Sequence, residues 1–167
     1  LSSMILKTYN CKIYLCDLPE TLIFQQYFLA NNIKNIKINY IANYNDNLDK
    51  KFNLTLINAD QLHRLSLEFN FAINTDSFGE MDKSSVNKYF KFIKNNLKKN
   101  GNFFYCNPVG LAGHAYSQPG NYPLSNNFKI EKIEVMYPSH RDTFCKYLMI
   151  LAKKKNSKKN SYNANNL

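Results

Sequence analysis

The stretch Cys11-Lys-Ile-Tyr-Leu-Cys-Asp-Leu-Pro-Glu-Thr-Leu22 joins a short strand to a helix and decides the fold class of the chain. Residues 11–16 form an apolar run typical of a strand, and the acidic Asp17 ends it. Pro19 suits the first turn of a helix, because that position needs no backbone N–H, so we expect a helix over about 19–31. A strand, a polar strand end and a following helix together form one step of an open α/β sheet.

The same alternation continues to about residue 152. Further strands are expected at 36–41, 54–57, 69–74, 102–106, 129–136 and 144–152. A second helix is expected at 83–99, where apolar residues recur every three or four positions; Asp82 can cap its start and Gly101 can close its end. We expect strands 11–16, 69–74 and 102–106 to lie parallel in one sheet, with strand 144–152 antiparallel to them. The predicted fold class is α/β.

The composition indicates one folded domain of 153 residues followed by a basic tail at 154–167 that we expect to be disordered. The chain has 167 residues and a formal net charge of +10, to which a lysine cluster at 153–159 contributes. No stretch approaches the roughly 20 apolar residues of a membrane-spanning helix. Four cysteines without paired spacing indicate reduced thiols, as in the cytoplasm.

Polar residues stand at the expected carboxyl ends of several strands. These are Asp17, Asp60, the segment 74–80 and Asn107. Open α/β sheets bind ligands beyond the carboxyl ends of their strands, so we expect the functional site at this edge. No group of His, Cys and Asp residues has the spacing of a metal site, and we expect a metal-independent reaction.

Two motifs taken together resemble one enzyme family. They are the stretch 11–22 with its Asp17-Leu-Pro19, and Ile73-Asn-Thr-Asp-Ser-Phe-Gly-Glu-Met81 with the helix after it. The pair is similar to the sugar O-methyltransferases, a family of class I S-adenosylmethionine-dependent methyltransferases, and residues 144–153 look like the antiparallel last strand of that class. The resemblance implies a Rossmann-like sheet, S-adenosylmethionine as cofactor, and methyl transfer to a hydroxyl of a saccharide or another small molecule.

One part of the family pattern has no counterpart in the sequence. The family's first strand and glycine-rich turn hold the methionine end of the cofactor, and residues 1–6 resemble the helix that follows this turn. We therefore expect a fragment of the methyltransferase domain, with an unpaired sheet edge beside the strand that carries Asp17. This chain alone is expected to bind the cofactor weakly or not at all.

The resemblance also implies roles for the residues that bind the cofactor. Asp17 would accept hydrogen bonds from both ribose hydroxyls, because a carboxylate offers two acceptor oxygens to a vicinal diol. Asp60 would accept from the adenine amino group, and Asn74 would line the same pocket. The alternatives are that Asp17 only caps the following helix, that Asp60 is an exposed loop residue, and that Asn74 satisfies loop backbone groups.

The leading catalytic candidates follow the fourth and later expected strands. Asp76 and Glu80 would orient the acceptor hydroxyl, and His114 would take its proton, with His140 and His63 ranked below it. Alternatively, Asp76 satisfies its own loop, Glu80 starts the helix after it, and the histidines are surface residues.

Two other functional classes stay open from the sequence. The chain could be a truncated or degenerate Rossmann-like module that binds a partner without catalysis. Its net charge also permits a nucleic-acid-binding domain, although the basic tail and solvated helix faces account for most of that charge. We expect no nucleic-acid partner.

Overall fold

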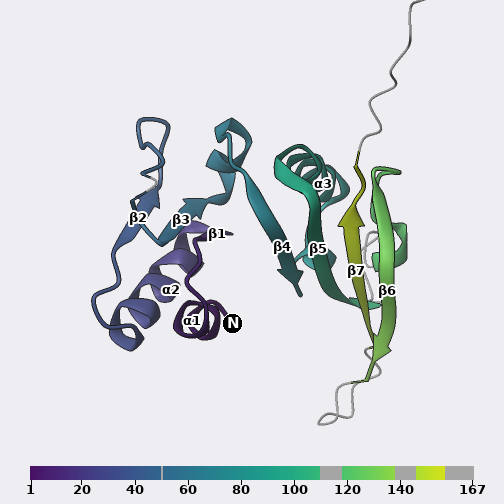
Figure 1. Ribbon diagram of the computed structural model, residues 1–167, viewed down its shortest axis with the longest axis horizontal. Helices are drawn as coiled ribbons and strands as arrows, with labels where there is room; N and C mark the ends of the chain where they lie inside the picture. Colours follow the sequence, from purple (N-terminus) through teal and green to yellow (C-terminus); the bar gives the residue numbers. More distant parts are fainter. Residues whose placement is uncertain (50, 110–117, 138–145, 157–167) are drawn as a thin grey trace, which may run out of the picture. The chain divides into compact units, whose positions relative to one another are not determined.

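The computed structural model describes residues 1–49, 51–109, 118–137 and 146–156. The chain divides into two compact units, residues 1–66 and 67–167, and each is described by itself. The elements are labelled in Figure 1.

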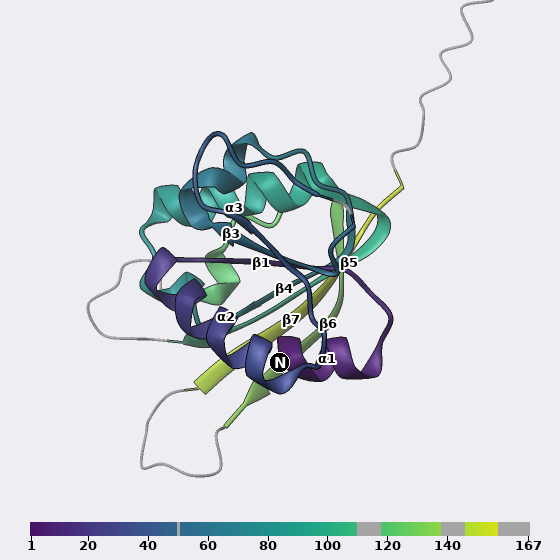
Figure 2. The ribbon, with the colours of Figure 1, turned by 90° about the vertical axis from the view of Figure 1, so that its left-hand side faces the viewer.

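The first unit is a small parallel sheet covered by helices. It contains α1 (Ser2–Thr8), β1 (Ile13–Asp17), α2 (Pro19–Asn32), β2 (Ile38–Ile41), β3 (Leu54–Asn58) and the 3-10 helix η1 (Ala59–Arg64). The strands lie in the order β1-β3-β2, and both pairs are parallel. Leu22 and Leu29 of α2 pack on Leu54 and Leu56 of β3, with Leu6 of α1 at the same core. Figure 2 shows α1 and α2 together in this unit.

The second unit is a mixed sheet with one long helix. It contains β4 (Phe69–Thr75), η2 (Phe78–Glu80), α3 (Lys83–Asn96), β5 (Leu97–Val109), η3 (Pro119–Asn121), β6 (Phe128–Met136) and β7 (Lys146–Lys154). The order is β4-β5-β7-β6 (Figure 1); β4 and β5 are parallel, and β7 is antiparallel to both β5 and β6.

An aromatic core fills the space between α3 and this sheet. Phe90 of α3 lies 5.3 Å from Phe103 and 5.8 Å from Tyr105, measured between ring centroids. Phe78 and Tyr122 close the cluster from the loops. Burial, with a smaller contribution from Tyr122, raises the pKa of Tyr105 well above its ordinary value, so this phenol stays protonated.

The strand and helix predictions are confirmed, but the prediction of one shared sheet is wrong. Strand β1 pairs with β3 and belongs to the first sheet, whereas β4, β5 and β7 form the second. Within the described residues, β1 and β4 are each an end strand of their own sheet. Within the second unit the predicted directions are confirmed, because β4 and β5 are parallel and β7 is antiparallel to β5. The predicted direction of β1 relative to β4 and β5 stays a prediction.

The second helix ends earlier than predicted. Asp82 caps its start, accepting from the Ser85 N–H at 2.9 Å, but α3 ends at Asn96 and Gly101 lies inside β5. A side chain at Gly101 would meet the Asn70 carbonyl oxygen at 2.8 Å, so this glycine permits close contact between β5 and β4. It does not close the helix.

The predicted tail begins too early by at least one residue. Lys154 belongs to β7, and its ammonium group donates to the carbonyl oxygens of Lys94, at 2.6 Å, and of Leu97. These carbonyls lie at the end of α3, where the helix leaves acceptors unsatisfied. Residues 157–167 lie outside the described residues.

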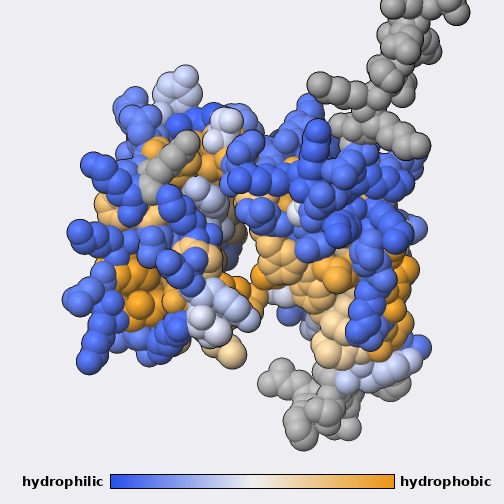
Figure 3. Space-filling model, viewed as in Figure 1, coloured by the Kyte–Doolittle hydropathy of each residue, from blue (hydrophilic) through white to orange (hydrophobic). Residues whose placement is uncertain are grey.

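Apolar side chains are also exposed on the surface (Figure 3). On α2 they gather on the face opposite Leu22 and Leu29, where Phe24 and Tyr27 are 75% and 74% exposed. Among the described helices, none has the length and hydropathy needed to cross a membrane.

Candidate functional site

The carboxyl ends of β1 and β3 lie side by side in the first unit. The two strands are parallel, and Asp17 pairs in register with Asn58. Asp60 follows in the first turn of η1. Asp17 and Asp60 therefore follow strand ends at the same edge of this sheet. That the segment 74–80 and Asn107, which belong to the second unit, share one site with them stays a prediction.

Asp17 is held by one donor on each of its carboxylate oxygens. Its Oδ1 accepts from the Leu18 N–H at 2.8 Å, and its Oδ2 accepts from Gln25 Nε2 at 3.0 Å. The N-cap of α2 is Leu18, and no side chain caps this helix. Asp17 is thus not the N-cap, which argues against the simple capping alternative.

The Asp17 carboxylate retains acceptor capacity. A carboxylate has about four lone-pair positions, and two of them receive donors from the described part of the chain. Asp17 is half-buried, so the group is oriented but still reachable from solvent. One open acceptor position on each oxygen suits two neighbouring hydroxyl groups.

Gln25 was not expected to contribute to this site. It lies two helical turns after Asp17, and its Nε2 orients the carboxylate. Its Oε1 is buried and has no hydrogen-bond partner among the described residues. Its spacing of eight residues from Asp17 is the only sequence signal, and that spacing becomes informative only once the helix start is known.

Arg64 organises the loop that follows β2. Its guanidinium group donates to the carbonyl oxygen of Asn43 and, at 3.1 Å, to that of Asp46, and lies 5.4 Å from the ring centroid of Tyr44. The Asp46 carboxylate in turn accepts from the N–H groups of residues 42 and 43. The loop after β2 therefore has a defined shape at the same edge as Asp17. Asp60 and His63 are both exposed beside it.

The turn at residues 74–80 connects β4 to α3 in the second unit. Asp76 adopts a positive φ of 62°, and its N–H donates to the Cys106 carbonyl oxygen at 3.0 Å. Aspartate tolerates this left-handed conformation better than most residues. Phe78 is buried, whereas Asp76 and Glu80 are exposed. The turn thus presents two carboxylates to solvent from a fixed backbone.

Asn74 and Asn107 link this turn to the end of β5. Asn107 Nδ2 donates to Asn74 Oδ1 at 3.0 Å, and Asn107 Oδ1 accepts from the Phe78 N–H at 3.0 Å. Asn74 Nδ2 donates to the Ser77 hydroxyl. The loop-satisfying alternative therefore describes Asn74 well, and its contact with a cofactor stays a prediction.

Cys106 lies beside the turn and is nearly buried. Burial first, and the nearby Asp76 charge second, raise the pKa of its thiol. The thiol therefore stays protonated at neutral pH and is a poor nucleophile.

The remaining catalytic candidates are the two histidines that follow β5 and β6 in the sequence. His114 and His140 lie outside the described residues, so the assignment of the general base stays a prediction. Within the described segments, no group of three or more His, Cys, Asp or Glu side chains could hold a metal ion.

A separate hollow of about 500 Å³ lies along α3. Its lining residues are Lys83, Ser84, Asn87, Lys88 and Lys91. This lining carries no carboxylate, imidazole or thiol, so it offers no group suited to general-base catalysis near neutral pH.

Comparison with solved structures identifies the fold. No protein-family model and no curated protein sequence matches the chain. Among solved structures, the chain is similar to the N-methyltransferase NodS from Bradyrhizobium japonicum WM9, with a TM-score of 0.59, 8% identity, and coverage of 87% of this chain and 74% of that chain. The chain has the Rossmann-like fold of class I methyltransferases.

Two further structures support this fold assignment. NodS in complex with S-adenosyl-L-homocysteine matches with a TM-score of 0.54 and 10% identity, covering 93% of this chain and 85% of that chain. Magnesium protoporphyrin IX methyltransferase from Synechocystis PCC 6803, with bound S-adenosylmethionine, matches with a TM-score of 0.54 and 9% identity, covering 86% of this chain and 60% of that chain. The similarity lies in the fold, because identity is so low.

Proposed function

We propose that the protein is an S-adenosylmethionine-dependent O-methyltransferase whose acceptor is a saccharide hydroxyl, and that residues 1–154 act as its methyltransferase domain. The observation that carries the proposal is the Asp17 carboxylate, oriented by Leu18 and Gln25 at a parallel strand end, with an open acceptor position on each oxygen. The methyltransferase fold and the cofactor complexes of its structural neighbours support the choice of cofactor.

Asp17 would accept hydrogen bonds from the two ribose hydroxyls of the cofactor, and Asp60 would accept one from the adenine amino group. S-adenosylmethionine, when bound, supplies a methyl group on a sulfonium that a nucleophile can attack in line. The protein's own contribution is then chiefly to position the two reactants. No metal is needed for this chemistry.

The exposed carboxylates of the 74–80 turn support the proposed acceptor. Asp76 and Glu80 can accept hydrogen bonds from sugar hydroxyls, and either can draw off a proton as the oxygen attacks. A polyhydroxylated acceptor suits two carboxylates better than an apolar acceptor does. An apolar acceptor would displace the water bound to each carboxylate without replacing its hydrogen bonds. His114 stays a candidate for the base. The sugar specificity is proposed from the motif 73–81 rather than from the structural neighbours.

The proposal is tested by calorimetry with S-adenosyl-L-homocysteine on the protein in its natural length, comparing Asp17→Asn with Glu20→Gln. Asp17→Asn should keep the fold, because the Gln25 amide can turn and present its unpartnered oxygen. It should weaken binding about 10- to 100-fold, since a hydrogen bond to a charged group contributes about 1.5–3 kcal/mol.

Glu20→Gln is the matched control, because it removes the same charge from an exposed position in the first turn of α2. Its affinity should stay within about twofold of the wild type, since exposed charges contribute little. Equal affinities of Asp17→Asn and wild type would refute the ribose role of Asp17. No binding by the wild-type protein would leave a non-catalytic Rossmann-like module as the better reading.

A further inference from the structure

Asn107 is a fully buried polar residue at the end of β5. Its side chain is 0% exposed. Its oxygen accepts from the Phe78 N–H, and its amide nitrogen donates to Asn74 Oδ1, each at 3.0 Å. Both ends of the amide are therefore occupied, and both contacts lead to the turn after β4. A buried amide is tolerated only when it is hydrogen-bonded in this way.

Several hydrogen bonds fix the turn to the end of β5. Besides the two bonds of Asn107, the Asp76 N–H donates to the Cys106 carbonyl oxygen at 3.0 Å, and Asn74 Nδ2 donates to the Ser77 hydroxyl. Asp76 has a φ of 62°. A non-glycine residue keeps such a conformation only where its surroundings hold it.

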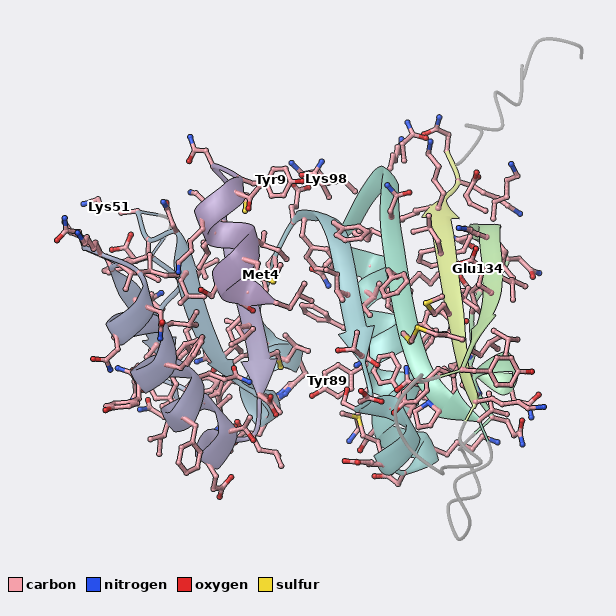
Figure 4. All side chains as sticks on the ribbon, turned by 90° about the horizontal axis from the view of Figure 1, so that it is seen from below. Met4, Tyr9, Lys51, Tyr89, Lys98 and Glu134 are labelled. Carbon is pink, nitrogen blue, oxygen red and sulfur yellow. The ribbon has the colours of Figure 1, made fainter. Side chains whose placement is uncertain are left out.

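The ring of Phe78 anchors the opposite side of the turn. Phe78 is 1% exposed and lies 5.3 Å from Phe90, 5.7 Å from Tyr122 and 5.9 Å from Tyr89, between ring centroids. Tyr89 is labelled on α3 in Figure 4. The turn is thus held through the Phe78 amide by Asn107 and through the Phe78 ring by the aromatic core, while Asp76 and Glu80 stay exposed.

We propose that Asn107 is a positioning residue that fixes the 74–80 turn, and through it the Asp76 and Glu80 carboxylates, for contact with the acceptor. This inference rests on the proposed function, in which those carboxylates face the acceptor hydroxyl. Asn107 itself touches neither substrate nor cofactor. It acts through the Phe78 N–H and through Asn74. Its loss should therefore reduce turnover far more than it reduces cofactor affinity.

The test compares Asn107→Leu, Asn107→Asp and the control Ile150→Val. Asn107→Leu removes both hydrogen bonds while keeping the same branched arrangement of side-chain heavy atoms. Asn107→Asp keeps an oxygen for the Phe78 N–H, and the Asn74 amide can turn to donate to it. Ile150 is 4% exposed in the same core, and its truncation lowers stability without touching the turn.

The first readout is amide hydrogen exchange, which requires no substrate. In the wild type, the Phe78 and Asp76 amides should be protected. In Asn107→Leu, the Phe78 amide should exchange at least about tenfold faster than the change in global stability explains. In Asn107→Asp it should stay protected, and in Ile150→Val it should follow global stability only.

The second readout is methyl transfer from S-adenosylmethionine to a panel of monosaccharides and glycosides, with cofactor affinity measured by calorimetry. Asn107→Leu should lower kcat about 100-fold, as expected for a misplaced reacting group, with a much smaller loss of cofactor affinity. Asn107→Asp should recover most of kcat, and Ile150→Val should retain it.

Unchanged kcat and unchanged Phe78 exchange in a folded Asn107→Leu would overturn the positioning role. If Asn107→Leu does not fold, the proposal is tested by amide exchange in Asn107→Asp and in the wild type. A Phe78 amide that is unprotected in the wild type overturns the proposal. Absence of methyl transfer by the wild type would refute the proposed function. In that case, a Phe78 amide that is protected in the wild type and loses this protection in Asn107→Leu would still show that Asn107 fixes the turn.

Discussion

At the scale of single residues, the sequence identified the groups that carry charge but did not predict which residues orient them. Asp17 and the 74–80 turn stand out because acidic residues follow apolar runs. Gln25 does not stand out, and Asn107 stands out only as a polar residue at a strand end, because the orienting role of each comes from partners that the fold brings close. Asn107 meets Asn74 from 33 positions away. Such a pairing depends on strand order and register, which single-residue properties do not encode.

Gln25→Leu tests the orientation of Asp17. The variant loses the 3.0 Å hydrogen bond to Asp17 Oδ2, but it also removes a buried oxygen that has no partner in the described part of the chain. Losing a hydrogen bond to a charged group costs about 1.5–3 kcal/mol, and removing an unsatisfied buried acceptor returns about 1–3 kcal/mol. The thermal midpoint should therefore hardly change.

Cofactor affinity of Gln25→Leu, measured by calorimetry, should nevertheless fall about 3- to 10-fold, because one carboxylate oxygen is no longer held in place. Gln26→Leu on the exposed surface of α2 serves as the control and should bind like the wild type. If both variants bind equally well, Gln25 has no part in orienting Asp17.

At the scale of secondary-structure elements, hydrophobic patterning located the helices and strands but not all of their ends. Helix α3 was expected to continue to residue 99 and to close at Gly101. It ends at Asn96, where Asn96 Oδ1 accepts from the Leu67 N–H at 3.3 Å and Lys154 donates to the last carbonyls. Leu97 is 2% exposed and is the first residue of β5. Tertiary burial thus overrides the helical pattern at this end.

The N-cap of α3 predicts a pH-dependent stability. The Ser85 N–H, followed by the Ser85 hydroxyl, holds the pKa of Asp82 below its ordinary value. Because the folded pKa is below the unfolded value of about 3.9, the ionised cap stabilises the fold above that pH. This stabilisation is lost as the pH falls through the lower, folded pKa.

Asp82→Ala should accordingly melt at a lower temperature than the wild type at pH 7, and the two thermal midpoints should converge as the pH is lowered through the folded pKa. Asp82→Asn retains a good N-cap without a titrating group, so its midpoint at pH 7 should lie close to that of the wild type. A gap between Asp82→Ala and wild type that is constant from pH 7 to pH 2 would contradict this account of the cap.

At the scale of the whole molecule, strand directions were easier to predict than sheet membership. The βα alternation favours parallel pairs, and β1–β3 and β4–β5 are parallel. The division into two sheets was not predicted, because it depends on which distant strands find each other. The exposed face of α2 and edge strand β6, which carries Glu134 (Figure 4), were likewise not evident from periodicity alone.

The fold matches solved structures although the sequence identity to them is very low. Identities of 8% to 10% with NodS accompany TM-scores of 0.59 and 0.54. A fold tolerates such divergence because hydrophobic pattern and volume, rather than residue identity, specify a core. Function must be argued from the strand-end residues, because one fold supports many activities.

The central claim is that the strand end at Asp17 binds the ribose of S-adenosylmethionine. It is tested most directly by following backbone and side-chain amide signals by NMR while S-adenosyl-L-homocysteine is added to the natural-length protein. The Leu18 N–H and the Gln25 side-chain amide should shift saturably, because both donate to the Asp17 carboxylate. The Ile150 amide, in the core of the second unit, should not move. Binding without any shift at Leu18 and Gln25, or no saturable shift at all, would contradict the claim.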